Sequence, residues 1–230
     1  LGVQSLDDNV LAAAGRGHTA ADTAAAVATL KAAGFATGFQ LMPGLPGEGW
    51  PSLIATGRRL LALGPDFIRI YPAVVLAGTP LAAMLAAGAY RPLTLAAAVA
   101  RAAFLKLAAE NRGIAVIRTG LQATAELSGG AVLAGPYHPA FGLLVEAFLF
   151  RVMIGGLLEK FPGPPGPVVL RHHPRDASAV RGLKNANLEA WRSAGLFTAC
   201  RLLADWPRRG EAAVVWRDMT VVINKAMIYN

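Results

Sequence analysis

The residues best placed to do chemistry in this chain stand where short apolar stretches end. Gln4 lies in LGVQS, Gln40 opens the octet QLMPGLPG, and Tyr71 lies in IRIYP. Side chains at the carboxyl ends of parallel strands meet at one edge of a sheet, and ligands bind there. The glycines and prolines after Gln40 indicate a turn into a helix that begins near Trp50. The pattern therefore predicts a ligand-binding edge in the first third of the chain.

Strand-like and helix-like stretches that position these residues alternate, with short connections between them. This β-α-β-α-β order calls for a parallel sheet with right-handed crossovers. The expected strands span 1–5, 35–42, 67–71 and 114–118, and the expected helices span 7–14, 20–33, 51–63, 80–87, 93–111 and 139–161. In the last of these helices, one apolar face is expected to pack on the barrel, with Phe141, Leu144, Val145, Phe148 and Val152 at helical spacing. The expected fold class is α/β, a partial parallel (β/α) barrel followed by a small α+β domain.

The run FPGPPGP at 161–167 is the clearest boundary, because four prolines and two glycines in seven residues cannot continue a helix. Residues 1–160 therefore form one predicted domain, and residues 168–230 form another. The second domain is expected to have the order β-α-α-β-β, with a hairpin that joins 197–204 to 212–216. A closing strand is expected in 219–229.

The composition restricts the classes of partner and site. A net charge of +8 and a pI near 10.2 suit an anionic partner such as RNA, although basicity can also serve solubility alone. The single cysteine, Cys200, excludes an intramolecular disulfide or a multi-cysteine metal site built from this chain, and we expect it to be a small buried hydrophobe. His172 and His173 would point to opposite faces of a strand, so no metal site is expected.

The most apolar window, 140–158, contains Glu146 and Arg151, which argues against a membrane span. No signal peptide is visible, so a cytoplasmic location is expected. Because the chain opens on what reads as the end of a strand, we also expect it to start inside a domain and to be truncated.

Four motifs in order, namely LGVQS, RGHT at 16–19, QLMPGLPG and IRIYP, resemble the radical S-adenosylmethionine superfamily. The closest branch is that of the elongator catalytic subunit and oxygen-independent coproporphyrinogen oxidase. The resemblance covers residues 1–160. It implies that Gln4, Arg16, Gln40 and Tyr71 contact S-adenosylmethionine, and that Arg16 pairs with its methionine carboxylate. Gln40 stands where relatives often carry an acidic residue that faces the ribose.

Each of these residues could instead have a purely structural role. Gln4 could be a strand-end polar residue, Arg16 a solvated charge and Tyr71 an edge of the core, while His18 more often caps a helix or lies on the surface. The stretches RTGLQ and AGPYHPAF resemble bacterial elongator-like members. By that resemblance the substrate contacts are Arg118, Gln122, Tyr137 and His138, and a loop-stabilising role is the alternative for each.

The chain departs from the family in one respect that decides its chemistry. The family binds a [4Fe–4S] cluster through a CxxxCxxC loop, which is absent here, and Cys200 cannot supply the thiolates alone. The chain is therefore expected to be the carboxyl half of a radical enzyme that is not competent as given. A half barrel exposes a sheet edge, so association with a missing half or with itself is expected.

A second resemblance lies in VRGLKNANLEAW at 180–191, which is similar to the KH module and its RNA-gripping GxxG loop. The corresponding loop is Gly182 to Asn185, with Asn in place of the second Gly, and Asn tolerates left-handed backbone. The RNA-binding residues implied by the resemblance are Arg181, Gly182, Lys184 and Asn185. A solvated basic surface is the alternative.

Together these observations predict the carboxyl-terminal portion of a radical S-adenosylmethionine enzyme that modifies RNA, at a tRNA uridine, with the KH-like domain docking the RNA. One alternative is a non-catalytic RNA-binding protein on a barrel scaffold. Another is an enzyme of the porphyrinogen oxidase type that acts on a small metabolite.

Overall fold

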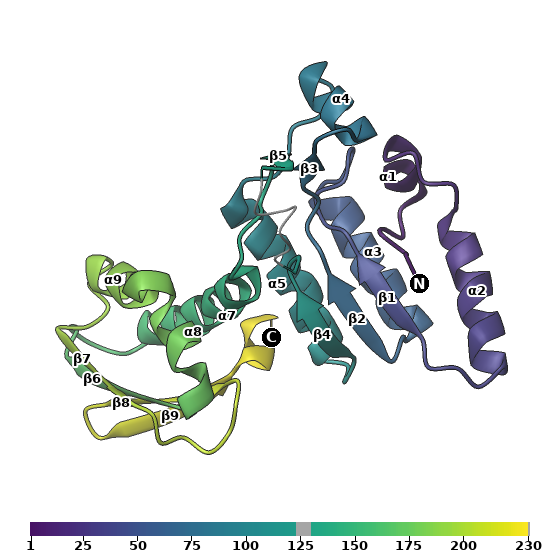
Figure 1. Cartoon of the computed structure of the whole chain (residues 1–230). Helices are drawn as coiled ribbons and strands as arrows, with labels where there is room; N and C mark the ends of the chain where they lie inside the picture. Colours follow the sequence, from purple (N-terminus) through teal and green to yellow (C-terminus); the bar gives the residue numbers. More distant parts are fainter. Residues whose placement is uncertain (123–129, 230) are drawn as a thin grey trace. The chain divides into compact units, whose positions relative to one another are not determined.

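The computed structural model describes residues 1–122 and 130–229 (Figure 1). The chain divides into two compact units, Leu1–Gly142 and Leu143–Asn230. The first unit is built on a three-stranded parallel sheet in the order β1-β2-β4, which comprises β1 (Gly38–Leu41), β2 (Phe67–Ile70) and β4 (Ala115–Thr119). The amino-terminal segment joins the free side of β1 through a parallel bridge between Gln4 and Leu41.

Five helices of the first unit are α1 (Asp8–Ala13), α2 (Ala20–Ala32), α3 (Trp50–Leu63), α4 (Pro80–Ala86) and α5 (Leu95–Glu110). Their starts follow from the sequence. Thr19 forms a capping box with Asp22 at the start of α2, and Thr94 caps α5 through the Ala97 amide. Gly64 adopts a left-handed φ of 55° at the end of α3, a conformation that glycine accepts most readily.

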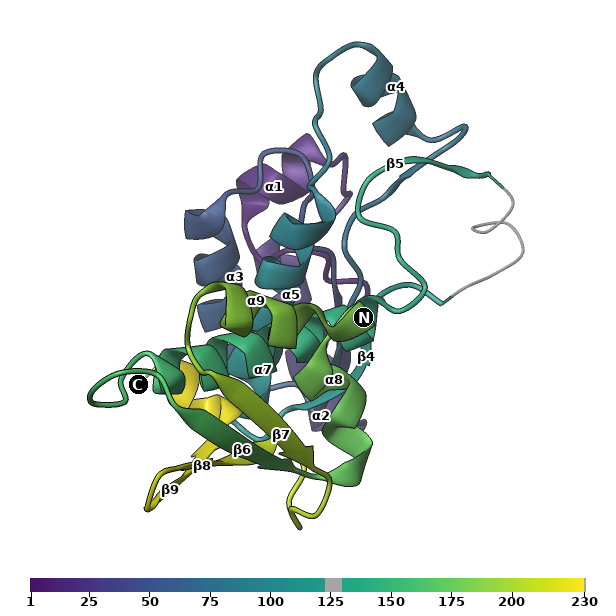
Figure 2. The ribbon, with the colours of Figure 1, turned by 90° about the vertical axis from the view of Figure 1, so that its left-hand side faces the viewer.

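Side-chain alternation in the strands separates the two faces of the sheet. Phe39, Leu41, Ile68 and Ile70 are almost completely buried, and α3 and α5 lie on one side of the strands (Figure 2). The residues between them, such as Gln40 and Arg69, therefore point to the opposite face. That opposite face is the one turned toward the viewer in Figure 1.

The expected α/β class, a parallel sheet covered by helices, is confirmed by these strands. One pairing was not anticipated. The strands β3 (Val75–Leu76) and β5 (Val132–Ala134) pair antiparallel in a separate two-stranded sheet. Strands this short carry too little periodicity to be recognised in sequence.

The second unit contains a four-stranded mixed sheet in the order β7-β6-β8-β9. Its strands are β6 (Pro167–His172), β7 (Ala199–Leu203), β8 (Glu211–Trp216) and β9 (Met219–Asn224). The helical elements that accompany it are α7 (Phe141–Leu158), whose first two residues fall in the first unit, η1 (Pro174–Asp176), α8 (Ala177–Arg181), η2 (Leu183–Asn185), α9 (Ala186–Ser193) and η3 (Lys225–Tyr229).

The expected hairpin between 197–204 and 212–216 is wrong. β7 pairs parallel with β6, and β8 pairs antiparallel with the other side of β6, so β6 separates the two strands. The hairpin forms instead between β8 and β9, across the short turn at Arg217. The β-α-α-β-β order itself is confirmed, and β9 is the closing strand expected in 219–229.

The boundary between the two compact units falls between Gly142 and Leu143 in the sequence, and not at the Pro/Gly run 161–167. The reason is α7, because its residues Phe150, Met153, Ile154 and Leu158 belong to the hydrophobic core of the second unit. Proline and glycine do end α7, but the end of a helix need not be the end of a domain. The apolar face of α7 also differs from the expected one, since Val152 is 40% exposed.

By length and composition alone, α7 could cross a membrane, as no other helix in the described residues could. Half of it is buried inside the molecule, and its core-facing residues belong to the same hydrophobic cluster as Trp191, Val214 and other residues of the second unit. The apolar composition of α7 is therefore accounted for by packing.

Candidate functional site

The expected ligand-binding edge forms at the carboxyl end of β1. The backbone N–H of Gln4 donates to the Gln40 carbonyl at 2.8 Å, and the Gln4 carbonyl accepts from the Met42 N–H at 2.8 Å. Gln4 has a left-handed φ of 64°, uncommon for a non-glycine residue. Its side chain is buried, with its Oε1 3.5 Å from Nε2 of Gln40. Two side-chain amides thus face each other at the strand end.

Arg16 and Tyr71 join the same edge. Nη2 of the exposed Arg16 lies 3.5 Å from the sulfur of Met42, a weak acceptor that leaves most of the guanidinium donors open. The Tyr71 N–H donates to the Leu41 carbonyl at 2.8 Å. All four residues named from the sequence are therefore linked to the end of β1 directly or through one neighbour. Their contact with S-adenosylmethionine stays a prediction.

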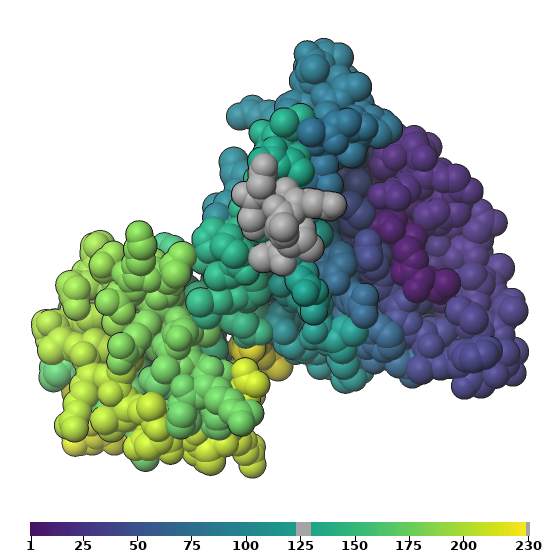
Figure 3. Space-filling model, viewed as in Figure 1, coloured from purple at the N-terminus to yellow at the C-terminus, as the bar shows by residue number. Residues whose placement is uncertain are grey.

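The ring of His18 contacts the amino-terminal segment and not the end of β1. Its Nε2 is 3.3 Å from the Val3 carbonyl, so the ring holds the amino-terminal segment beside α2. The amino-terminal residues themselves lie at the surface on the open face of the sheet, drawn in the darkest purple in Figure 3.

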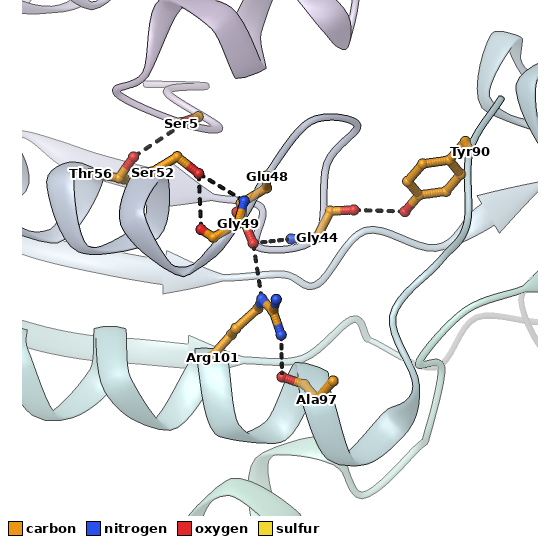
Figure 4. Close-up of polar contacts among 9 residues, drawn as sticks. All are labelled: Ser5, Gly44, Glu48, Gly49, Ser52, Thr56, Tyr90, Ala97 and Arg101. Atoms are coloured by element: carbon orange, nitrogen blue, oxygen red, sulfur yellow. Dashed lines mark hydrogen bonds and ion pairs between the residues drawn. The ribbon is translucent and has the colours of Figure 1, made fainter.

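The loop 43–49 that follows β1 is fixed by buried polar groups (Figure 4). Oε1 of Glu48 accepts a hydrogen bond from the Gly44 N–H at 2.8 Å and forms an ion pair with Nε of Arg101 at 3.3 Å. The hydroxyl of Tyr90 donates to the Gly44 carbonyl at 2.6 Å. Arg101 also lies over the ring of Trp50, with 5.0 Å between its guanidinium carbon and the ring centroid. Both polar groups of Gly44 are therefore satisfied inside the protein.

Burial changes the titration of two groups in this network. It raises the pKa of Glu48 to about 7, because desolvation outweighs the opposing effects of the Gly44 amide and of Arg101. Burial, aided by the negative charge of Glu48, raises the pKa of Tyr90 to about 12. This network could not be recognised in the sequence, because Glu48, Tyr90 and Arg101 lie in three separate segments that only the fold brings together.

The open face of the sheet also carries Arg69, which is not among the site residues named from the sequence. Arg69 of β2 is in register with Gln40 of β1 and with Arg118 of β4. Beside it, a cavity of about 450 Å³ is lined by residues that include Gly38, Gln40, Phe67 and Arg69. Figure 3 shows this face hollowed next to the amino-terminal segment. The alternation in FIRIY was a usable signal, because it places Arg69 opposite the buried isoleucines.

The four expected substrate contacts have different settings. Nη1 of Arg118 donates to Oε1 of Gln122 at 2.6 Å, so these two residues form a pair on the exposed end of β4. His138 caps the start of α7, because its Nδ1 accepts from the Ala140 N–H at 3.0 Å and its carbonyl accepts from Phe141. Tyr137 is half-buried. For His138 the loop-stabilising role is thus present in the structure, and substrate contact stays a prediction for all four.

In the second unit, the loop 182–185 joins α8 to α9. Gly182 has a φ of 73°, and a Cβ there would lie 2.9 Å from the Asn187 nitrogen, so the position requires glycine. Lys184 and Asn185 both adopt left-handed conformations, with φ values of 53° and 65°. The expectation that Asn185 supports a left-handed turn is confirmed. Arg181, Lys184 and Asn185 are exposed, as RNA contact would require.

A single buried amide holds this loop in place. Nδ2 of Asn187 donates to the carbonyls of Ala147 at 2.9 Å, Ala179 at 3.1 Å and Val180 at 3.2 Å. It therefore ties the start of α9 to both α7 and α8. The loop is positioned by a neutral group, while its charged side chains remain in solvent.

The residues of this chain do not fit an iron–sulfur cluster. Such a cluster needs several thiolates, and the chain has one cysteine. Cys200 lies on β7 of the second unit, partly packed against its core. Burial raises the pKa of its thiol to about 11, which disfavours the thiolate.

Parts of this chain are similar to known proteins. The Radical_SAM C-terminal domain matches residues 65–151. A tRNA uridine(34) acetyltransferase of Methanocaldococcus jannaschii is 36% identical over 95 residues, which cover 40% of this chain and 18% of that protein. A protein of the same name from Dehalococcoides mccartyi is 36% identical over 95 residues, which cover 40% of this chain and 21% of that protein.

Among solved structures, the archaeal Methanocaldococcus infernus Elp3 with an N-terminal deletion superposes with a TM-score of 0.56 and 26% sequence identity. The match covers 65% of this chain and 34% of that chain. The matched region therefore spans about a fifth of the curated relatives and a third of the solved structure.

Proposed function

We propose, from the premise that this chain is a relative of the Elp3-type radical S-adenosylmethionine proteins, that it forms the carboxyl-terminal portion of a tRNA-modifying enzyme. In this proposal the first unit binds S-adenosylmethionine, and the second unit binds tRNA near the uridine to be modified. The names of the relatives support tRNA as the substrate class.

The observation that carries the proposal is the meeting of Gln4, Arg16 and Gln40 at the carboxyl end of β1. The amide pair can hydrogen-bond ribose hydroxyls, and the guanidinium of Arg16 can pair with the methionine carboxylate. The left-handed backbone of Gln4 is further support, because such conformations in non-glycine residues are concentrated at functional positions. Bound S-adenosylmethionine would supply the reactive adenosyl and methionine groups, and these residues would hold and orient them.

Radical chemistry is not assigned to this chain by itself. A cluster would have to be held by thiolates from another polypeptide segment, since the residues here do not fit one. We therefore propose association with an amino-terminal half as a condition of catalysis, because a second copy would add only one further cysteine. The single cysteine equally favours the second candidate function, a non-catalytic tRNA-binding protein.

RNA binding is assigned to the second unit. Residues 143–230 hold 12 of the 22 basic and 7 of the 14 acidic residues, a net charge of +5. The exposed loop 182–185, flanked by Arg181, presents backbone and side-chain donors at one turn. By its resemblance to the KH module, this loop would bind the RNA backbone. Binding to phosphates predicts a steep dependence on salt.

Two binding measurements test the proposal. Calorimetric titration with S-adenosylmethionine should give saturable binding, and Arg16→Gln should weaken it about tenfold or more, as expected for loss of a charge-assisted pair. Arg58→Gln is the matched control, since Arg58 is exposed on the helical side of the sheet. Full-strength binding by Arg16→Gln would overturn the assigned cofactor site.

For RNA, fluorescence anisotropy with labelled tRNA should give an affinity that falls steeply between about 50 and 200 mM salt. The double variant Arg181→Gln, Lys184→Gln should weaken binding and flatten the salt dependence. Binding of a porphyrinogen in place of tRNA would support the small-metabolite alternative. If the chain binds tRNA but shows no binding of S-adenosylmethionine in the calorimetric titration, the non-catalytic alternative is supported.

A further inference from the structure

We propose that Arg69 and Arg118 form a phosphate-binding pair on the open face of the β1-β2-β4 sheet, and that this pair takes a backbone phosphate of the RNA substrate. The nature of the polymer rests on the proposed function. The pairing of the two arginines rests on the sheet register alone.

The register places the two arginines opposite each other on neighbouring strands. Arg69 of β2 pairs with Arg118 of β4, and an irregularity between Ile68 and Arg69 lets Arg118, rather than Ile117, occupy the facing position. Neighbouring strands lie about 4.8 Å apart, and residues in register project to the same face. Because Ile68 and Ile70 are buried on the helical side, Arg69 projects to the open face, where it is exposed.

Two like charges in register repel each other and destabilise a sheet unless an anion lies between them. Within residues 1–122 and 130–229, Arg69 makes no ion pair or side-chain hydrogen bond that could offset this repulsion. Arg118 is oriented by the amide oxygen of Gln122, which is neutral. The arrangement is therefore electrostatically incomplete, and a bound anion would complete it.

Phosphate is the anion that fits the surroundings best. Guanidinium groups bind phosphate through paired, parallel hydrogen bonds, and two of them can share one phosphodiester. On the same face, the ring of Phe67 lies over Gly38, where an added Cβ would come within 2.1 Å of the ring. Phe67, Gln40 and Arg69 line one cavity, which thus offers an aromatic ring, an amide and a cation. These are the groups that recognise an unstacked nucleotide.

The position on the strands also suits a substrate. Arg69 and Arg118 each stand one residue before the carboxyl end of their strand, the edge at which Gln4, Gln40 and Tyr71 gather. A phosphate held there would lie next to the edge that we assign to the cofactor. The pair is therefore a substrate-positioning site adjacent to, and separate from, the residues assigned to S-adenosylmethionine.

The experiment compares the whole chain with Arg69→Gln, which keeps the length of the side chain and removes its charge. Arg58→Gln removes the same charge from the helical side and serves as the control. We expect Arg69→Gln to weaken tRNA binding about fivefold to tenfold and to reduce the salt slope by about 1. Arg58→Gln should stay within about twofold of the parent chain. Circular dichroism of each variant checks that the fold is kept.

A small probe separates this proposal from the proposed function. Uridine monophosphate should raise the melting temperature of the parent chain, uridine without phosphate should not, and Arg69→Gln should abolish the shift. If the parent chain fails to bind tRNA but shows this Arg69-dependent shift, the proposed function fails and the phosphate pair stands. Unchanged binding of both tRNA and uridine monophosphate by Arg69→Gln would overturn the pair, as would an equal shift with malonate, which carries carboxylates only.

Discussion

Two loops of this molecule precede a helix and either follow or contain residues that are assigned a ligand, yet they are fixed by opposite means. The loop 43–49 is held in place by the ionisable side chains of Glu48, Tyr90 and Arg101. The loop 182–185 is held by the neutral amide of Asn187, and its ionisable residues are exposed. In the first loop charge serves position, whereas in the second it is left available for a partner.

Because of this difference, the first loop should respond to pH and the second loop to salt. A buried carboxyl group with a raised pKa makes the geometry of the first loop sensitive to pH. An amide has no such titration, so the second loop should keep its shape across the same range. Exposed charges respond instead to ionic strength, which screens them. Variants in each loop can therefore test which groups fix it.

The largest effect is expected from Glu48→Ala. This change leaves the guanidinium of Arg101, whose side chain is 12% exposed, without its carboxylate, and the Gly44 N–H without its acceptor. Removing one partner of a buried pair costs about 3–5 kcal/mol. Urea unfolding at pH 8 measures the loss. Adding Arg101→Met should restore part of it, and an unaltered stability of the single variant would show that the pair does not fix the loop.

The second prediction concerns pH. The pKa of Glu48 is raised from 4.5 to about 7 in the folded protein, so between these values the folded state binds more protons than the unfolded state. The stability contributed by protonation is complete below about pH 4.5 and lost as the pH rises through about 7. From pH 5 to pH 8 the parent chain should lose about 2–3 kcal/mol relative to Glu48→Gln. Parallel pH profiles for the two proteins would contradict the assignment.

The third prediction addresses the amide of the second loop. Asn187→Ala removes the donor shared by three buried carbonyls and should lower the free energy of unfolding by about 2 kcal/mol, equally at pH 5 and pH 8. Asn9→Ala, at an exposed position on α1, is the control and should change it by less than about 0.5 kcal/mol. A loss that depended on pH would remove the contrast between the two loops.

The smallest effect is expected from Asn185→Gly. Glycine adopts the left-handed conformation without steric cost, so stability should change by less than about 1 kcal/mol, with the gain in backbone fit opposed by the entropy of the unfolded chain. The tRNA affinity should stay within about twofold if the loop acts through its backbone. A large loss of affinity would assign the contact to the Asn185 side chain.

Much of the fold was accessible from local patterns. The order of the longer strands and helices, the cap at Thr19, and the left-handed Asn185 follow from spacing and residue type. So does the gathering of Gln4, Gln40 and Tyr71, because parallel strands bring their carboxyl ends together. The family resemblance read from four short motifs is confirmed by the domain match and by the relatives.

Other features depend on contacts between distant segments. The sequence marks where β7 and β8 lie, but the choice of β6 as the neighbour of both is made by hydrogen bonding across the whole sheet. In the same way, α7 ends at prolines that resemble a linker, and only its packing against Trp191 and Val214 places it in the second unit.

The periodicities, the turns and the motif residues at strand ends can be read from the amino-acid order, since each depends on near neighbours in the chain. Tertiary structure alone decided the Glu48–Arg101 pair and the Arg69–Arg118 register, because each requires segments dozens of residues apart to meet at one alignment. A shift of one residue would turn Arg69 toward the helices, and no local pattern specifies that alignment.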